Sequence, residues 1–143
     1  MRKMSKVVLL LCVFIFVVYV LICMLSSLWL RHIVVKCNTE TLFDQSIAMY
    51  FSDKSLIQSL DYRCEARHLT TKPTFDIQVS LPFFAVGIGQ SYARFYVTWN
   101  GYEEIRDERI HRVGVRNQAV DVRLQWQNGK WVITDITKHE YLD

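Results

Sequence analysis

The stretch that decides the fold lies over residues 7–30 and reads VVLLLCVFIFVVYVLICMLSSLWL. Its 24 residues include no charged residue, no Pro and no Gly, and its only hydroxyl groups belong to Tyr19, Ser26 and Ser27. At about 1.5 Å per residue, a helix of this length spans about 36 Å, enough to cross a hydrocarbon core of ~30 Å. Backbone groups in lipid must bond to one another, so the stretch is predicted to be a transmembrane helix. Trp29 stands where an interfacial aromatic anchor is expected.

This apolar stretch is expected to stay in the mature protein. A cleaved signal peptide has an apolar core of about 7–15 residues, followed by a cleavage site with small residues. The stretch over residues 7–30 is longer than such a core, and no A-x-A pattern follows it. The sequence therefore predicts a retained membrane anchor.

The charge distribution indicates how the chain is oriented in the membrane. The chain has 17 Lys and Arg residues and 14 Asp and Glu residues, a net charge of +3. From residue 31 onward the two signs balance, so the excess charge belongs to Arg2, Lys3 and Lys6. Positive charge favours the cytoplasmic side, and we expect a single-pass protein of the cytoplasmic (inner) membrane with its C-terminal domain outside. Because the rest of the chain is neutral, its charge does not predict nucleic-acid binding.

These features divide the chain into four parts. Residues 1–6 form a cytoplasmic tail, residues 7–30 the transmembrane helix, and residues 31–38 a juxtamembrane segment. Residues 39–143 then form an extracytoplasmic domain, whose length suits one small domain. That domain begins close to the membrane, so its reach from the bilayer is expected to be short.

The four cysteines fall into two groups. Cys12 and Cys23 lie in the membrane stretch and are expected to act as small apolar residues. Cys37 and Cys64 lie outside it and are predicted to form a disulfide in an oxidising compartment, worth roughly 3–4 kcal/mol in the chain-entropy model. Two separate thiols remain the alternative. No Cys or His spacing resembles a metal site, and we expect neither a metal nor a cofactor.

Helical patterns come first in the outer domain. Thr41 and Asp44 fit a capping box, and apolar residues then recur at helical spacing. We predict a helix over residues 41–51 and a second over residues 53–61, either as a pair or as one kinked helix.

From residue 74 the apolar period changes to two, which predicts a half-buried strand. Pro82 places the end of this strand at a sheet edge or a bend. The apolar, Gly-containing segment that follows has two interpretations: a loop tucked into the core, or a contact surface for a partner protein. The candidate residues for partner contact are Phe83, Phe84, Val86 and Ile88.

Two Asn-Gly pairs predict type I′ hairpin turns. Folding about Asn128-Gly129 makes the following pairs of opposite residues: Trp126 and Trp131, Leu124 and Ile133, and Val122 and Asp135. Cross-strand aromatic pairs of this kind stabilise a sheet.

The first pair, Asn100-Gly101, would join a strand over residues 91–99 to one that begins at Tyr102. Arg94 would then face Asp107, and Tyr96 would face Ile105. A helix over residues 102–112 is the competing interpretation, because Asn100 and Glu103 also resemble a capping box.

Helices followed by antiparallel strands are typical of an α+β fold. The predicted fold is a single N-terminal transmembrane helix, followed by a small domain in which N-terminal helices pack on a curved antiparallel sheet. The ending over residues 127–136, QNGKWVITDI, resembles the final hairpin of the nuclear-transport-factor-2-like (cystatin-like) superfamily. The resemblance covers residues 39–140.

The resemblance implies a curved sheet wrapped around helices to form a cone-shaped pocket, although this domain is short for the superfamily. Membrane-anchored relatives with this layout include inner-membrane assembly proteins of type IV secretion and conjugation systems, which act as protein-contact scaffolds. Enzymatic relatives use an Asp, Tyr or His inside the cone, and none of those residues can be matched to a position in this chain.

Two functions therefore compete. The first is a protein-interaction or assembly component of a cell-envelope machine, with other envelope proteins or a second copy as partners. The second is a small-ligand-binding or enzymatic domain. No catalytic motif is present, although an enzyme could still use isolated carboxylates such as Asp76, Asp121 or Asp135. We favour the first function and expect no enzymatic activity.

Overall fold

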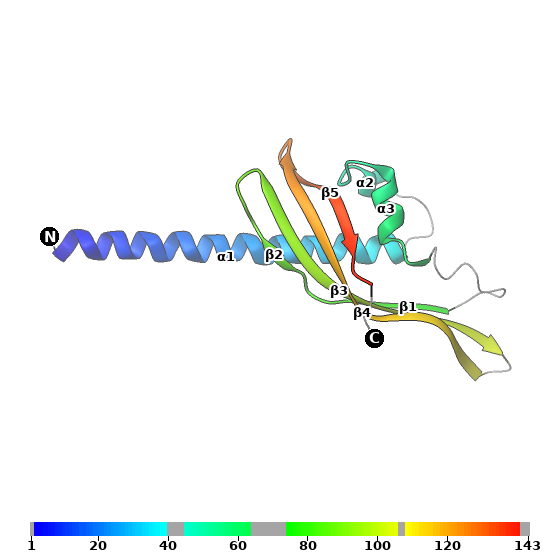
Figure 1. Cartoon of the computed structure of the whole chain (residues 1–143). Coiled ribbons are helices and arrows are strands. Elements are labelled where there is room, and N and C mark those ends of the chain that lie inside the picture. The colour runs from blue at the N-terminus through cyan, green and yellow to red at the C-terminus, as the bar shows by residue number, and fades with distance from the viewer. Residues whose placement is uncertain (1, 40–44, 64–73, 106–107, 141–143) are drawn as a thin grey trace.

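The computed structural model describes residues 2–39, 45–63, 74–105 and 108–140. It confirms the α+β layout, with a long apolar N-terminal helix followed by helices and a small antiparallel sheet (Figure 1). The helices are α1 (Arg2–Thr39), α2 (Gln45–Ala48) and α3 (Lys54–Leu60). The strands are β1 (Thr74–Val79), β2 (Phe83–Ala85), β3 (Gln90–Ile105), β4 (Glu108–Gln127) and β5 (Lys130–Lys138).

The helix α1 is long and apolar enough to cross a membrane, and no other described helix is. Its first half projects away from the rest of the chain (Figure 1), with exposed side chains from Val7 to Leu25, apart from the half-buried Cys23. Its second half continues without a break through residues 31–38, the predicted juxtamembrane segment. This half packs into the domain and therefore belongs to the core.

The buried side chains of the second half of α1 recur every three to four residues, which places them on one face of the helix. They are Ser26, Ser27, Leu30, Ile33, Val34, Cys37 and Asn38. Between them, Arg31 and His32 belong to the exposed side of the helix. This periodicity is the ordinary pattern of an amphipathic helix that covers a core.

The sheet is antiparallel, with strand order β1-β3-β4-β5, and β2 also pairs with β3. Because β4 occupies the other side of β3, β1 and β2 form two parts of the same sheet edge. One face of the sheet packs against α1 and is called the inner face; the opposite face is called the outer face. The inner face carries the buried residues Ala93, Phe95, Val97, Trp99, Val120, Val122 and Leu124.

The C-terminal hairpin is confirmed. Asn128 and Gly129 both have positive φ, 50° and 76°, as a type I′ turn requires. Trp126 pairs with Trp131, and their rings pack edge to face with centroids 4.9 Å apart.

The predicted register of this hairpin holds through Leu124 and Ile133 and then fails. Val122 pairs with Ile136, and Asp135 instead pairs with Arg123. The cause is a bulge, in which Thr134 is the extra residue and its hydroxyl donates to the Arg123 carbonyl at 3.3 Å. The shift turns Ile136 toward the buried face and leaves Asp135 exposed.

The hairpin predicted at Asn100-Gly101 is wrong, and so is the competing helix. The strand β3 runs through both residues, with Asn100 opposite Gly114 and Gly101 opposite Val113. Neither residue adopts the positive φ of a type I′ turn. The flanking strands are long enough to continue pairing, so a favourable turn sequence does not force a turn here.

The first helix of the domain ends earlier than predicted. Residues 41–44, with the predicted capping box, lie outside the described part of the chain, and α2 ends at Ala48. The chain then leaves the helix because Phe51 forms a parallel bridge with Ile133 of β5. The second helix agrees better with the prediction: Asp53 caps α3 by accepting a hydrogen bond from the Ser55 amide at 3.1 Å.

Candidate interaction surfaces

The predicted partner-contact residues do not form one surface. Phe83 is 70% exposed and Ile88 is fully exposed, whereas Phe84 is only 4% exposed. The Phe84 ring packs against Trp131 with centroids 5.5 Å apart. Val86 is half-buried. Phe84 therefore belongs to the core, whereas Phe83 and Ile88 face outward, and their contact with a partner protein stays a prediction.

The break at Pro82 explains this split. Val79 is buried at the end of β1, and the alternation would next bury Leu81 and Phe83, but both are exposed. The edge strand is interrupted between β1 and β2, as expected for a proline at a sheet edge. Pairing resumes with Phe84 opposite the buried Ala93, so in β2 the inward position has moved by one residue.

A groove of about 330 Å³ lies between α1 and the segment that contains β2. Its lining is almost entirely apolar; the residues are Tyr19, Val20, Cys23, Met24, Ser27, Leu81, Pro82, Phe83, Phe84 and Ala85. Tyr19 also connects the two sides, because its hydroxyl donates to the Val86 carbonyl at 2.9 Å.

The predicted membrane anchor, Trp29, lies in the half of α1 that joins the domain. Its indole is half-buried and meets Tyr50 edge to face, with ring centroids 5.4 Å apart. It therefore packs at least partly on protein, and its role as an interfacial anchor stays a prediction.

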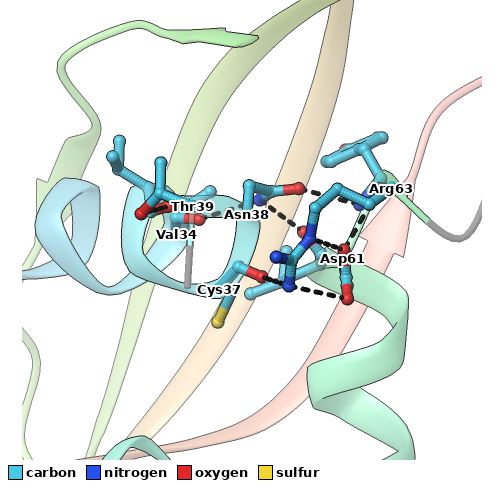
Figure 2. A network of polar contacts seen from close by, with 9 residues as sticks. Val34, Cys37, Asn38, Thr39, Asp61 and Arg63 are labelled. Atoms are coloured by element: carbon cyan, nitrogen blue, oxygen red, sulfur yellow. Dashed lines mark hydrogen bonds and ion pairs between the residues drawn. The ribbon is translucent and has the colours of Figure 1, made fainter. Parts of the chain in front are cut away.

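The end of α1 is attached to the end of α3 by Asn38, a buried side chain whose polar groups are all used (Figure 2). Its amide nitrogen donates to the carbonyls of Val34 and Leu60, both at 2.8 Å, and its amide oxygen accepts from the Tyr62 backbone N–H at 2.8 Å. The bonds to Leu60 and Tyr62 satisfy backbone groups where α3 ends.

Arg63 adds a second connection beside Asn38, as Figure 2 shows. Its guanidinium donates to the Cys37 carbonyl at 2.8 Å and pairs with the Asp61 carboxylate at 2.9 Å. Cys37 itself is buried. No disulfide joins the cysteines that the structure describes, but Cys64 lies outside them, so the predicted Cys37–Cys64 bond stays a prediction.

The outer face of the sheet carries a polar cluster centred on Asp121. Arg94 donates to both carboxylate oxygens, from Nε at 2.6 Å and from Nη2 at 2.7 Å. The Tyr92 hydroxyl also donates to this carboxylate, and His139 Nε2 contacts it from beyond β5. The Asp121 side chain is only 17% exposed, and the Arg94 side chain is 43% exposed.

These contacts determine the protonation state of the cluster. The hydrogen bonds from Arg94 hold the pKa of Asp121 far below its ordinary value. In turn, the hydrogen bond with Asp121 raises the pKa of Arg94 and that of Tyr92. Asp121 is therefore an anion at neutral pH, which suits holding neighbouring side chains in place rather than transferring protons.

The three acids singled out in the sequence are not brought together. Asp76 is exposed on β1 and Asp135 is exposed on β5, whereas Asp121 lies within its cluster on the outer face. Sequence reasoning missed the pairing of Arg94 with Asp121 because it placed the turn at Asn100-Gly101. Their pairing also depends on two register shifts between β3 and β4, at Val97/Trp99 and at Gly101/Tyr102, which the sequence pattern did not indicate.

Among the described residues, no group of three or more His, Cys, Asp or Glu side chains could hold a metal ion. Comparison with protein-family models, curated proteins and solved structures found no match to this chain.

Proposed function

We propose that this chain is a single-pass protein of the cytoplasmic membrane whose extracytoplasmic domain acts as a protein-interaction and assembly component of a cell-envelope machine, of the secretion or conjugation type. The observation that carries the proposal is the outer face of the sheet, which presents Tyr92, Arg94 and Tyr96 to solvent. Tyr and Arg are the residue types that, with Trp, dominate binding energy at protein interfaces. The Asp121 carboxylate holds two of the three in fixed positions, which lowers the entropic cost of binding.

The attachment of the domain to α1 supports the same role. Trp131 Nε1 donates to Ser26 Oγ at 3.3 Å, Arg31 Nε donates to the Val79 carbonyl at 3.0 Å, and Asn38 connects α1 to α3. These contacts are distributed along the second half of the helix. A domain attached in this way presents its outer face at a fixed height and angle above the bilayer, as a scaffold requires.

Retention of α1 is part of the proposal. Cleavage after the apolar stretch would remove Ser26, Ser27 and Leu30, which lie in the core of the domain. The orientation rests on the positive charges of Arg2 and Lys3, with Lys6, before the span.

The small-ligand or enzymatic alternative receives less support. A cone-shaped pocket needs a hollow on the inner face, and α1 fills that face with Leu30 and Val34. A cavity of about 490 Å³ lies instead at the β1 edge, beside Arg31 and Val35, and it is the natural place to look for a ligand.

Photo-crosslinking from the outer face in the native membrane tests the interaction. We expect the wild-type chain to be crosslinked to envelope proteins that can be identified. Tyr96→Ala should reduce the yield of these crosslinked products on the order of 10-fold or more, as at an interface hot spot. Gln58→Ala, an exposed change on α3, is the matched control and should leave the yield unchanged. Equal yields from both variants would contradict the assignment of this face.

Protease added to spheroplasts tests the orientation independently. The domain should be digested while the cells remain intact. Protection until lysis would place it in the cytoplasm and overturn the extracytoplasmic role.

A further inference from the structure

The edge of the sheet at β2 and the turn that follows it form an unusually apolar surface. No charged residue occurs between Asp76 and Arg94. Within that interval Leu81, Phe83 and Ile88 all have exposed side chains. Single exposed apolar residues need no explanation, but several on one continuous segment indicate a contact with an apolar partner.

This segment lies beside the membrane helix. The strand β2 contacts α1, and the Tyr19 hydroxyl donates to the Val86 carbonyl at 2.9 Å. Tyr19 belongs to the exposed, uncharged half of α1 that is fit to cross a bilayer. The apolar surface of the β2 segment is therefore continuous with the lipid-facing surface of α1, and the apolar groove lies between them.

The length of α1 indicates how deep the contact lies. The exposed apolar residues run from Val7 to Leu25, which at about 1.5 Å per residue corresponds to roughly 28 Å, close to the thickness of the hydrocarbon core. Tyr19 precedes Leu25 by six residues, so its bond to Val86 lies about 9 Å below that end of the span. Amphipathic elements that lie in a membrane interface are buried to a depth of about 5–10 Å.

The β4–β5 turn lies at the same end of the sheet and also has an exposed apolar side chain beside it. Gln90 pairs with Gln125, so the β2–β3 turn and the β4–β5 turn lie at the same end. Figure 1 shows both turns on the side of the domain toward the projecting half of α1. Trp126, before the β4–β5 turn, is 55% exposed, and Trp is the residue that favours the boundary between lipid and water.

We propose that the β2 segment and the β2–β3 turn, with Leu81, Phe83 and Ile88, are immersed in the interfacial layer of the same bilayer that α1 crosses. The occupant of the apolar groove is then a lipid acyl chain. The hydrogen bond from Tyr19 satisfies the Val86 carbonyl, which would otherwise be costly at this depth. This inference does not depend on the proposed protein partner, because it uses a different surface of the domain.

The test uses the full chain in vesicles of phosphatidylcholine and phosphatidylglycerol, with added tryptophans as probes. Ile88→Trp places an indole at the turn, and Asp76→Trp places one on the exposed side of β1, far from it. The signal of each added indole is the difference from the wild-type spectrum, and near-UV circular dichroism shows that each variant is folded. The quencher is a phosphatidylcholine brominated in the upper part of its acyl chains.

We expect the indole from Ile88→Trp to emit at shorter wavelength and to be quenched several-fold more than the indole from Asp76→Trp. A blue shift without quenching by the brominated lipid would mean that a second copy of the chain covers the turn, and would overturn the proposal. Equal quenching of both indoles would also overturn it, because the turn would then have no special depth. Emission typical of water at both positions would place the turn in solvent and exclude immersion.

Discussion

The two halves of α1 are both rich in apolar residues, but one half is exposed and the other packs into the domain. From Val7 to Leu25 the helix is apolar on all sides, and its side chains are exposed apart from the half-buried Cys23, which is a stable arrangement only in lipid. From Ser26 onward the helix has one buried face and one face that carries Arg31 and His32. The same helix is thus long and apolar enough to cross a membrane at one end and is a core element of the domain at the other.

This difference shows that apolar composition alone does not locate the boundary between membrane and domain. The uncharged stretch ends at Leu30, but the buried face of α1, called the buried stripe, begins at Ser26, four residues earlier. The better signal is periodicity, because a helix that covers a core buries a residue at every third or fourth position. Polar residues within that stripe, such as Asn38, indicate a protein partner rather than lipid.

The largest effect is expected from a charge placed in the buried stripe. Leu30→Asp would bury a carboxylate with no partner, at a cost of several kcal/mol, and a domain of this size has about 5–15 kcal/mol to lose. We expect the domain not to fold, measured in detergent micelles by near-UV circular dichroism. Leu28→Asp changes an exposed leucine on the same turn and should leave the domain folded; a loss of folding in both variants would contradict the division of α1 into two faces.

The next effect concerns the attachment of β5 to α1. Trp131 packs against Phe84 and donates to Ser26, so Trp131→Ala should cost roughly 3–5 kcal/mol. Urea unfolding of the full chain, followed by tryptophan fluorescence, measures this cost. Lys130→Ala, one residue away, serves as control with little expected change. Similar unfolding midpoints for the two variants would mean that the hairpin is not part of the core.

A smaller effect is expected at the link between α1 and α3. Asn38→Ala removes the buried hydrogen bonds to the Leu60 carbonyl and from the Tyr62 N–H, which should cost about 2–3 kcal/mol. Thr39→Ala removes only an exposed hydroxyl that bonds back to Val35 and is the control. The same unfolding experiment compares the two, and an Asn38→Ala protein as stable as Thr39→Ala would show that the link does not matter to stability.

The smallest effect is expected on the outer face. Because the pKa of Asp121 is lowered in the folded state, its pairing stabilises the fold at neutral pH, and this stabilisation is lost as pH falls below the ordinary pKa of 3.8. Asp121→Asn should lower the melting temperature at pH 7 by on the order of 2 °C. The difference in melting temperature between variant and wild type should become smaller as the pH falls below ~4. A difference that became larger would contradict a stabilising role for the Asp121 carboxylate at neutral pH.

Local patterns predicted those elements whose structure depends on a few neighbouring residues. The Asn128-Gly129 turn needs only two residues with positive φ, and Asp53 caps its helix locally. The bulge at Thr134 depends on how β5 fits the core and left no sign in the pattern. The hairpin predicted at Asn100-Gly101 failed for the same kind of reason, because long-range strand pairing outweighed a local turn preference.

The surfaces were predicted less well than the fold. Phe84 and Phe83 are adjacent and identical in type, yet one is buried and the other exposed, because Pro82 shifts which positions face inward. The cluster around Asp121 combines residues from β3, β4 and the segment after β5. Only the correct strand register brings these residues together, and the sequence alone did not provide it.

The most direct test of the account compares two truncated chains, residues 26–143 and residues 39–143. The first keeps the buried half of α1, and the second removes it together with Leu30, Ile33 and Val34, each worth about 1.5–3 kcal/mol when fully buried. Thermal unfolding followed by near-UV circular dichroism should show a cooperative transition for the longer chain and none for the shorter. A cooperative transition at the same temperature in both would show that the second half of α1 is not part of the domain core, and would contradict the account.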